Sequence, residues 1–105
     1  MPDAASLRRP ARLDASVRGR VQGVGFRYFV RGEAARLGIK GWVANQADGS
    51  VRCVAEGPRT SLEALLVSLR EGPPGAVVRD VSTTWSEPTG EFDAFGVRSA
   101  GHRGD

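Results

Sequence analysis

The chain has 105 residues, a formal net charge of +3 and a single cysteine, Cys53. This length predicts one domain with one modest core and no second domain to carry a separate cofactor. Residues 1–12 hold three Arg and one Asp, whereas residues 13–98 hold eleven basic and ten acidic residues, so the folded part lacks the broad basic surface typical of nucleic-acid-binding proteins. One cysteine excludes an internal disulfide and a multi-cysteine zinc site, as is usual in a reducing cytosol.

The first half of the chain predicts a strand, a helix and a hairpin after a disordered tail at residues 1–11. Apolar and polar residues alternate from 13 to 21, which is typical of a half-buried strand. Apolar residues at helical spacing then run from about Val24 to Leu37, and Gly38 is a common helix stop. Two alternating runs, 40–45 and 50–56, are joined through Asp48-Gly49, which is a hairpin signal.

The second half predicts a helix, a strand and a short edge strand. A helix opens at Pro58. Thr60 with Glu63 has the spacing of a capping box, although Pro58 indicates an earlier start. It ends at the Gly-Pro-Pro-Gly run of residues 72–75, and strands follow at 77–85 and 92–98, before a second disordered tail at 99–105.

The order of the predicted elements is β-α-β-β-α-β over a domain at residues 12–98. This order predicts an α+β fold, the ferredoxin-like split β-α-β plait, with an antiparallel sheet covered by two helices on one face. The same fold occurs in RNA-binding proteins, metal carriers and enzymes, so function has to be argued from a site.

The junction between the first strand and the first helix is the most informative segment, and it reads G-R-V-Q-G-V-G-F-R-Y from Gly19 to Tyr28. Gly23 and Gly25 allow successive N–H groups to turn inward, and the helix start adds unpaired donors and the positive end of its dipole. Arg27 adds a charged fork that fits two phosphate oxygens. The segment therefore suggests a phosphate site without a metal. It matches neither a Walker loop nor a dinucleotide fingerprint, so an ordinary glycine-containing turn remains an equal alternative on these residues alone.

Three segments together resemble the acylphosphatase family. They are V-R-G-R-V-Q-G-V-G-F-R-Y-F from Val17 to Phe29, G-W-V-A-N from Gly41 to Asn45, and D-G-S-V from Asp48 to Val51. The resemblance spans about residues 13–98, and these motifs show no departure from the family pattern.

The resemblance implies hydrolysis of the carboxyl-phosphate bond of a small-molecule acyl phosphate, with no cofactor and no metal. It implies that Arg27 binds the substrate phosphate and that Asn45 orients the attacking water. It also implies that backbone amides line the phosphate. These amides belong to Gln22, Gly23, Val24, Gly25 and Phe26.

The chemistry of the residues agrees with such a substrate. A carboxylate leaves readily without being protonated, so an acyl phosphate can be cleaved without a general acid or a metal. The only histidine, His102, lies in the predicted C-terminal tail, which leaves no plausible histidine nucleophile or histidine metal site. Asn45 cannot act as a base near neutral pH, but its amide oxygen can accept a hydrogen bond from water.

Other reactive residues receive structural interpretations. Cys53 lies in mid-strand and is predicted to be a core residue, not a nucleophile. Asp48 and Glu56, a candidate acid and base, are assigned to a turn and to a strand end. The alternative function is a non-catalytic phosphate-binding or RNA-binding module of the same fold, although RNA binding calls for aromatic residues that the first and third strands lack.

We expect a cytoplasmic monomer with no nucleic-acid or membrane partner. No hydrophobic run of the sequence approaches the length that spans a membrane.

Overall fold

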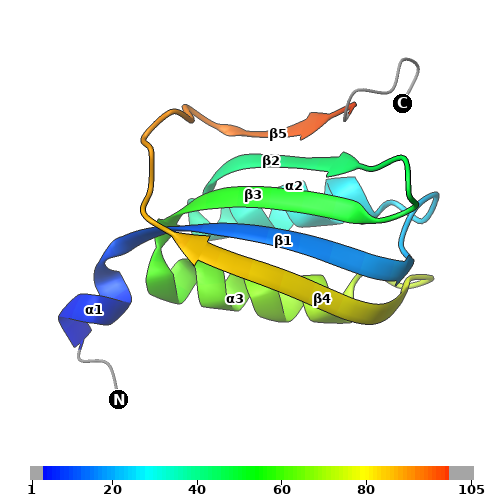
Figure 1. The fold of residues 1–105 in the computed structure, drawn as a ribbon, viewed down its shortest axis with the longest axis horizontal. Coiled ribbons are helices and arrows are strands. Elements are labelled where there is room, and N and C mark those ends of the chain that lie inside the picture. The colour runs from blue at the N-terminus through cyan, green and yellow to red at the C-terminus, as the bar shows by residue number, and fades with distance from the viewer. Residues whose placement is uncertain (1–3, 100–105) are drawn as a thin grey trace.

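The computed structural model describes residues 4–99, and these form a five-stranded sheet with two long helices on one face and a short helix at the N-terminal end (Figure 1). The elements are α1 (Ala4–Arg8), β1 (Pro10–Arg20), α2 (Phe26–Leu37), β2 (Lys40–Asn45), β3 (Val51–Pro58), α3 (Arg59–Glu71), β4 (Val77–Ser86) and β5 (Phe95–Arg98). The strand order is β4-β1-β3-β2-β5, and all neighbours are antiparallel except β2 and β5. This architecture confirms the predicted ferredoxin-like plait.

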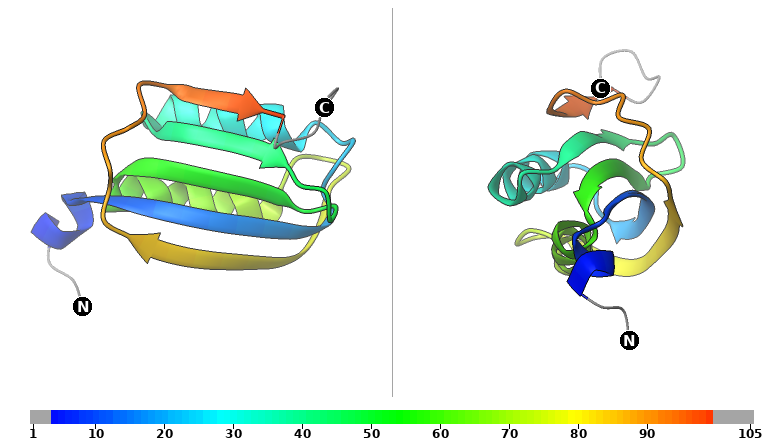
Figure 2. Two further views of the ribbon diagram at one scale, coloured as in Figure 1. Left: turned by 45° about the horizontal axis from the view of Figure 1, so that its top comes forward. Right: turned by 90° about the vertical axis from the view of Figure 1, so that its left-hand side faces the viewer.

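The core lies between the sheet and the two long helices. Alternate residues of β1 point toward the helices, so Leu13, Ala15 and Val17 are fully buried while their neighbours are not. Helix α3 adds a leucine stripe at helical spacing, and α2 adds Phe26 and Val30. Helix α2 packs against β2 and β5, whereas α3 packs against β1, β3 and β4, so the two helices lie side by side under different parts of the sheet (Figure 2). No helix within residues 4–99 combines the length and the apolar character needed to cross a membrane.

Three connections meet at one end of the sheet, at the right of Figure 1. They are residues 21–25 between β1 and α2, residues 46–50 between β2 and β3, and residues 72–76 between α3 and β4. The opposite end holds α1 and the segment 87–94, which leads from β4 to β5 (Figure 1).

The N-terminal segment differs from the predicted tail over residues 4–11. Residues 4–8 form α1, and β1 begins at Pro10. Strand β3 extends to Pro58, beyond its predicted end, and gives the start of β1 a partner to pair with. The backbone N–H of Arg59 also donates to the carbonyl of Arg9 at 3.1 Å. The predictions for residues 1–3 and 100–105 lie outside the described residues.

Two other elements begin later than predicted, α2 and β5. Strand β5 begins at Phe95 and not at residue 92. Helix α2 begins at Phe26, because Gly25 adopts a left-handed conformation that is incompatible with a continuing helix. Helix α3 has no side-chain cap: Thr60 lies inside it, and Glu63 instead accepts a hydrogen bond from Nε of Arg59 at 3.2 Å. The spacing of Thr60 and Glu63 therefore makes no capping box, and the earlier start that Pro58 indicated is the one observed.

Candidate functional site

Residues 22–26, which we call the cradle, form the loop between β1 and α2. Gly23 has a φ of 75° and Gly25 a φ of 78°, both in the left-handed region. A Cβ atom added at either position would meet nothing within 4 Å, so glycine is needed for its conformation and the space above the loop is open. No acceptor among residues 4–99 takes the backbone N–H groups of residues 23–26. These donors, together with the N-terminus of α2, can bind an anion.

Arg27 follows the cradle in the first turn of α2. Its Nη1 donates to the carbonyl of Arg98, at the end of β5, over 3.4 Å. Arg98 is the register partner of Ala44 in the parallel pair of β5 and β2, and neighbouring strands lie about 4.8 Å apart. The structure therefore brings Arg27 next to the end of β2, where Asn45 lies.

The side chain of Gln22 connects the cradle to the turn that follows Asn45. Its Nε2 donates to the carbonyl of Gln46 at 2.8 Å and to the carbonyl of Ser50 at 3.0 Å. The N–H of Gln46 donates to the same Ser50 carbonyl at 2.8 Å and closes the turn. The sequence suggested a role only for the backbone amide of Gln22. A polar side chain between a strand and a glycine was the only available signal, and it does not identify the partner.

Asp48 builds this turn, as predicted. Its Oδ1 accepts hydrogen bonds from the backbone N–H of Ser50 at 2.9 Å and from the Ser50 hydroxyl at 2.6 Å. These bonds lower the pKa of Asp48 below its ordinary value. Arg18 lies 3.8 Å from the other carboxylate oxygen. Because its pKa is lowered and one of its oxygens is engaged in the turn, Asp48 is a poor candidate for a general base.

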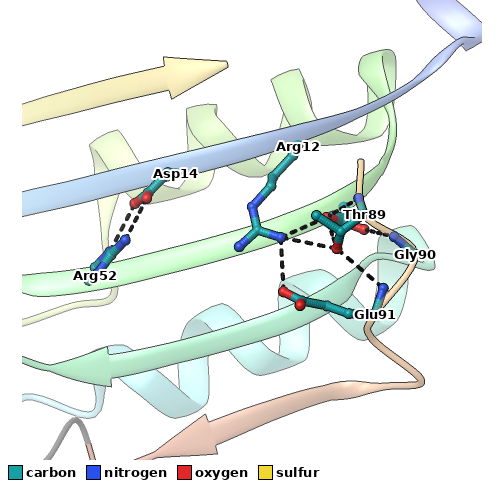
Figure 3. Close-up of polar contacts among 7 residues, drawn as sticks. Arg12, Asp14, Arg52, Thr89, Gly90 and Glu91 are labelled. Carbon is teal, nitrogen blue, oxygen red and sulfur yellow. Dashed lines mark hydrogen bonds and ion pairs between the residues drawn. The ribbon is translucent and has the colours of Figure 1, made fainter. Parts of the chain in front are cut away.

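Glu56 lies at the opposite end of the sheet and holds the segment 87–94. Its Oε2 accepts from Nη1 of Arg12 at 2.9 Å, from the N–H of Thr89 at 2.8 Å and from the Thr89 hydroxyl at 3.0 Å, and its Oε1 accepts from the N–H of Gly90 at 3.0 Å. Figure 3 shows Arg12, Thr89 and Gly90 close together, with Glu91 bound to Arg12. Burial alone would raise the pKa of Glu56, but the hydrogen bonds outweigh it and lower that pKa. The acid–base alternative for Asp48 and Glu56 is therefore not supported.

Cys53 is fully buried in β3, in agreement with its predicted place in the core. Burial, with a smaller contribution from the charge of Asp14, raises the pKa of its thiol to about 12. Asp14 itself pairs with Arg52 through hydrogen bonds of 2.6 and 3.0 Å (Figure 3). The thiol stays protonated at neutral pH and is no nucleophile. Across residues 4–99, no cluster of three or more His, Cys, Asp or Glu side chains offers a metal site, and His102 lies outside this range.

Comparisons with known proteins find one family in both sequence and structure. The family model described as Acylphosphatase matches residues 13–97. An acylphosphatase from Salinibacter ruber is 51% identical over 87 residues, which cover 83% of this chain and 92% of that protein. One from Pyrobaculum aerophilum is 47% identical over 88 residues, or 83% of this chain and 93% of that protein. The crystal structure of acylphosphatase from Bacillus subtilis superposes with a TM-score of 0.81 at 40% identity, over 84% of this chain and 98% of that one.

Proposed function

The chain belongs to the acylphosphatase family and hydrolyses acyl phosphates, and we propose that its cradle and Arg27 bind the phosphoryl group while Asn45 orients the attacking water. The observation that carries this proposal is the set of N–H groups at residues 23–26, which donate to no acceptor among residues 4–99 and directly precede Arg27 in the chain. Donors arranged in this way before the substrate arrives need no reorganisation during the reaction.

The cradle and Arg27 supply positioning and charge neutralisation, which are the main tasks in phosphoryl transfer. The amides bind the phosphoryl oxygens, and the guanidinium of Arg27 can bind two of them at once. As the reaction proceeds, the bond between phosphorus and the acyl oxygen breaks, and its electron pair stays on the departing carboxylate. Because a carboxylate is a stable anion, no residue has to protonate it.

Asn45 acts on the incoming water. Its side-chain oxygen accepts a hydrogen bond and aims the water at phosphorus, but the amide is too weak a base to take the proton. We therefore assign the proton to a phosphate oxygen or to solvent. The position of Asn45 supports this role, because the end of β2 lies beside the Arg98 carbonyl that Arg27 contacts.

We further infer that the protein acts as a monomer on a small molecule in the cytoplasm, without a nucleic-acid partner. The RNA-binding alternative is not favoured, since β1 and β3 carry no aromatic residue on the open face of the sheet. Cations on that face are also paired, Arg52 with Asp14 and Arg12 with Glu56.

Variants of Arg27 and Asn45 test the two roles with benzoyl phosphate as substrate. Arg27→Gln should lower turnover by about 10²-fold or more and weaken inhibition by inorganic phosphate, since its charge acts on both ground and transition states. Asn45→Ala should lower turnover by a similar factor but leave phosphate inhibition within a few-fold of wild type. Arg31→Gln is the matched control, because this exposed arginine stacks on Tyr28 instead.

Phosphate binding can be read independently from thermal unfolding. At about ten times its dissociation constant, phosphate should stabilise the fold by roughly 1.4 kcal/mol. This is a rise of several degrees in Tm for a domain of this size. The rise should persist in Asn45→Ala and Arg31→Gln and shrink in Arg27→Gln. Full turnover in Asn45→Ala, or an undiminished thermal shift in Arg27→Gln, would contradict the proposed roles.

A further inference from the structure

The segment 72–76, Gly-Pro-Pro-Gly-Ala, lies directly against the cradle; we call it the proline loop. A Cβ atom added at Gly72 would lie 3.0 Å from Cε2 of Phe26. Phe26 is the last residue of the cradle, and its backbone N–H is one of the proposed phosphate donors. The buried side chain of Phe26 therefore spans the distance between the proline loop and the phosphate site.

The proline loop and Asn45 flank the cradle on different sides. On one side, Gln22 contacts the 46–50 turn that follows Asn45. On the other side, Phe26 contacts the loop that leads into β4. Strand β2 lies near one edge of the sheet, and β4 forms the other edge. The 46–50 turn and the proline loop therefore lie toward opposite edges of the sheet (Figures 1 and 2).

The geometry of the reaction then places the acyl group. In phosphoryl transfer the attacking and leaving oxygens lie roughly in line, on opposite sides of phosphorus. If water approaches from Asn45, the carboxylate departs toward the other flank. We propose that the acyl group of the substrate lies against the proline loop, and that this loop favours uncharged, apolar acyl groups. The inference rests on the proposed function, because it uses the assigned position of the water.

The composition of the loop supports an apolar preference. Residues 72–78 carry no charged side chain and no side-chain hydrogen-bond donor, and its two prolines lack backbone N–H groups. Val77, the next residue, leaves 52% of its side chain exposed. An acyl group with an aromatic ring would cover this surface, whereas a second carboxylate would find no cation within residues 72–78. The neighbouring cation is Arg20 of β1, the register partner of Val77.

Backbone hydrogen bonds hold the loop in a defined turn. The N–H of Ala76 donates to the Pro73 carbonyl at 3.1 Å, and Gly75 has a φ of 90°, as expected for a turn with proline before glycine. At its start, the N–H of Gly72 donates to the Ser68 carbonyl at 2.8 Å. A surface that is already ordered binds a ligand without a large entropic cost.

Paired charge variants at Pro74, which is exposed, test the proposal. The readout is kcat/KM for 4-carboxybenzoyl phosphate divided by kcat/KM for benzoyl phosphate. Both substrates carry the same phosphate, so effects of a new charge on the phosphate cancel. Pro74→Lys should raise this ratio and Pro74→Asp should lower it, each by about threefold at low ionic strength for charges roughly 7 Å apart in water. Both shifts should shrink at high salt.

Ala47→Lys and Ala47→Asp are the matched controls, because Ala47 is exposed in the turn on the Asn45 flank. The ratio should stay near the wild-type value in both. A ratio that responds at residue 47 as strongly as at residue 74, or at neither residue, overturns the proposal. So do shifts in the same direction for Lys and Asp at Pro74, which would indicate a distorted loop. Arg27 and Asn45 are intact in all four variants, so failure here is distinct from failure of their proposed roles.

Discussion

The side-chain nitrogen of Gln22 lies 2.8 Å from the carbonyl oxygen of Gln46, the residue directly after Asn45. The same nitrogen lies 3.0 Å from the carbonyl oxygen of Ser50. The side chain of Gln22 thus connects the cradle, which is proposed to bind phosphate, to the 46–50 turn. That turn directly follows Asn45, which is proposed to orient the water. These two bonds hold the cradle beside the 46–50 turn.

Gln22→Met should loosen the contact between the cradle and the 46–50 turn while preserving most of the side-chain volume. It removes both hydrogen bonds, at a cost of about 0.5–1.5 kcal/mol for each. Neither carbonyl is left unpaired, because Gln46 still accepts from the N–H of Gly49 and Ser50 from the N–H of Gln46. We expect turnover of benzoyl phosphate to fall about tenfold, because small errors in position are costly in phosphoryl transfer. Phosphate inhibition should change little, since the backbone donors remain. Phosphate binding as weak as in Arg27→Gln would instead show that the Gln22 side chain contacts phosphate directly.

Glu56 should make the stability of the fold dependent on pH. Its pKa is lower in the folded protein than in the unfolded chain, so the folded state favours the ionised form. The stabilisation is complete above the unfolded pKa, near 4.3, and is lost as the pH falls through the lower folded value. Glu56→Gln should therefore lower the free energy of unfolding by about 1–3 kcal/mol at pH 7. The difference from wild type should shrink toward pH 3, as measured by urea unfolding. A difference that is constant between pH 7 and pH 3 would assign the effect to packing, not to charge.

Most of the fold could be predicted because the chain carries local signals for it. Alternation in residues 13–21, the Asp48-Gly49 turn and the leucine spacing of α3 each identify an element without knowledge of its neighbours. The local pattern of the segment 87–94 is misleading, because it predicts a strand from residue 92, whereas β5 begins at Phe95. The position of this segment depends on bonds from Thr89 and Gly90 to Glu56, and nothing in the spacing of these residues indicates that they meet.

The candidate site was likewise predictable only in its local features. Gly23 and Gly25 predicted a loop with left-handed residues, because few other residues adopt that conformation, and the structure contains such a loop. The contacts of Arg27 with Arg98 and of Gln22 with Gln46 depend on how strands and loops assemble. Such long-range contacts follow from tertiary packing and not from local pattern.

Hydrolysis of benzoyl phosphate should survive exhaustive dialysis against a chelator. In the proposed mechanism Arg27 and the cradle amides neutralise the phosphoryl charge, and the carboxylate leaves without protonation. Phenyl phosphate, which has the same ring but a poorer leaving group, should be turned over slowly or not at all. Activity that disappears with the chelator and returns with Mg²⁺ would contradict this mechanism.

The N-terminal segment should contribute to stability but not to catalysis. Its contacts are with α3 and β3, because the Arg9 carbonyl accepts the N–H of Arg59, and Pro10 and Ala11 pair with the end of β3. Arg59 in turn lies over the ring of Trp85 at 3.6 Å. All of these groups lie at the end of the sheet away from the cradle (Figure 1). Removal of residues 1–11 should therefore cost about 1–2 kcal/mol in unfolding free energy for the lost backbone pairing.

For a domain of this size, that loss corresponds to a fall in Tm of several degrees, which differential scanning calorimetry can resolve. The reference is a chain without residues 1–3, which keeps α1 and the paired start of β1. Turnover of benzoyl phosphate and inhibition by phosphate should be the same in both truncated chains, since neither change reaches Arg27 or Asn45. An unchanged Tm after removal of residues 1–11 would show that the pairing of Pro10 and Ala11 adds no net stability. A large loss of turnover at temperatures where the protein stays folded would show that the segment acts on the site.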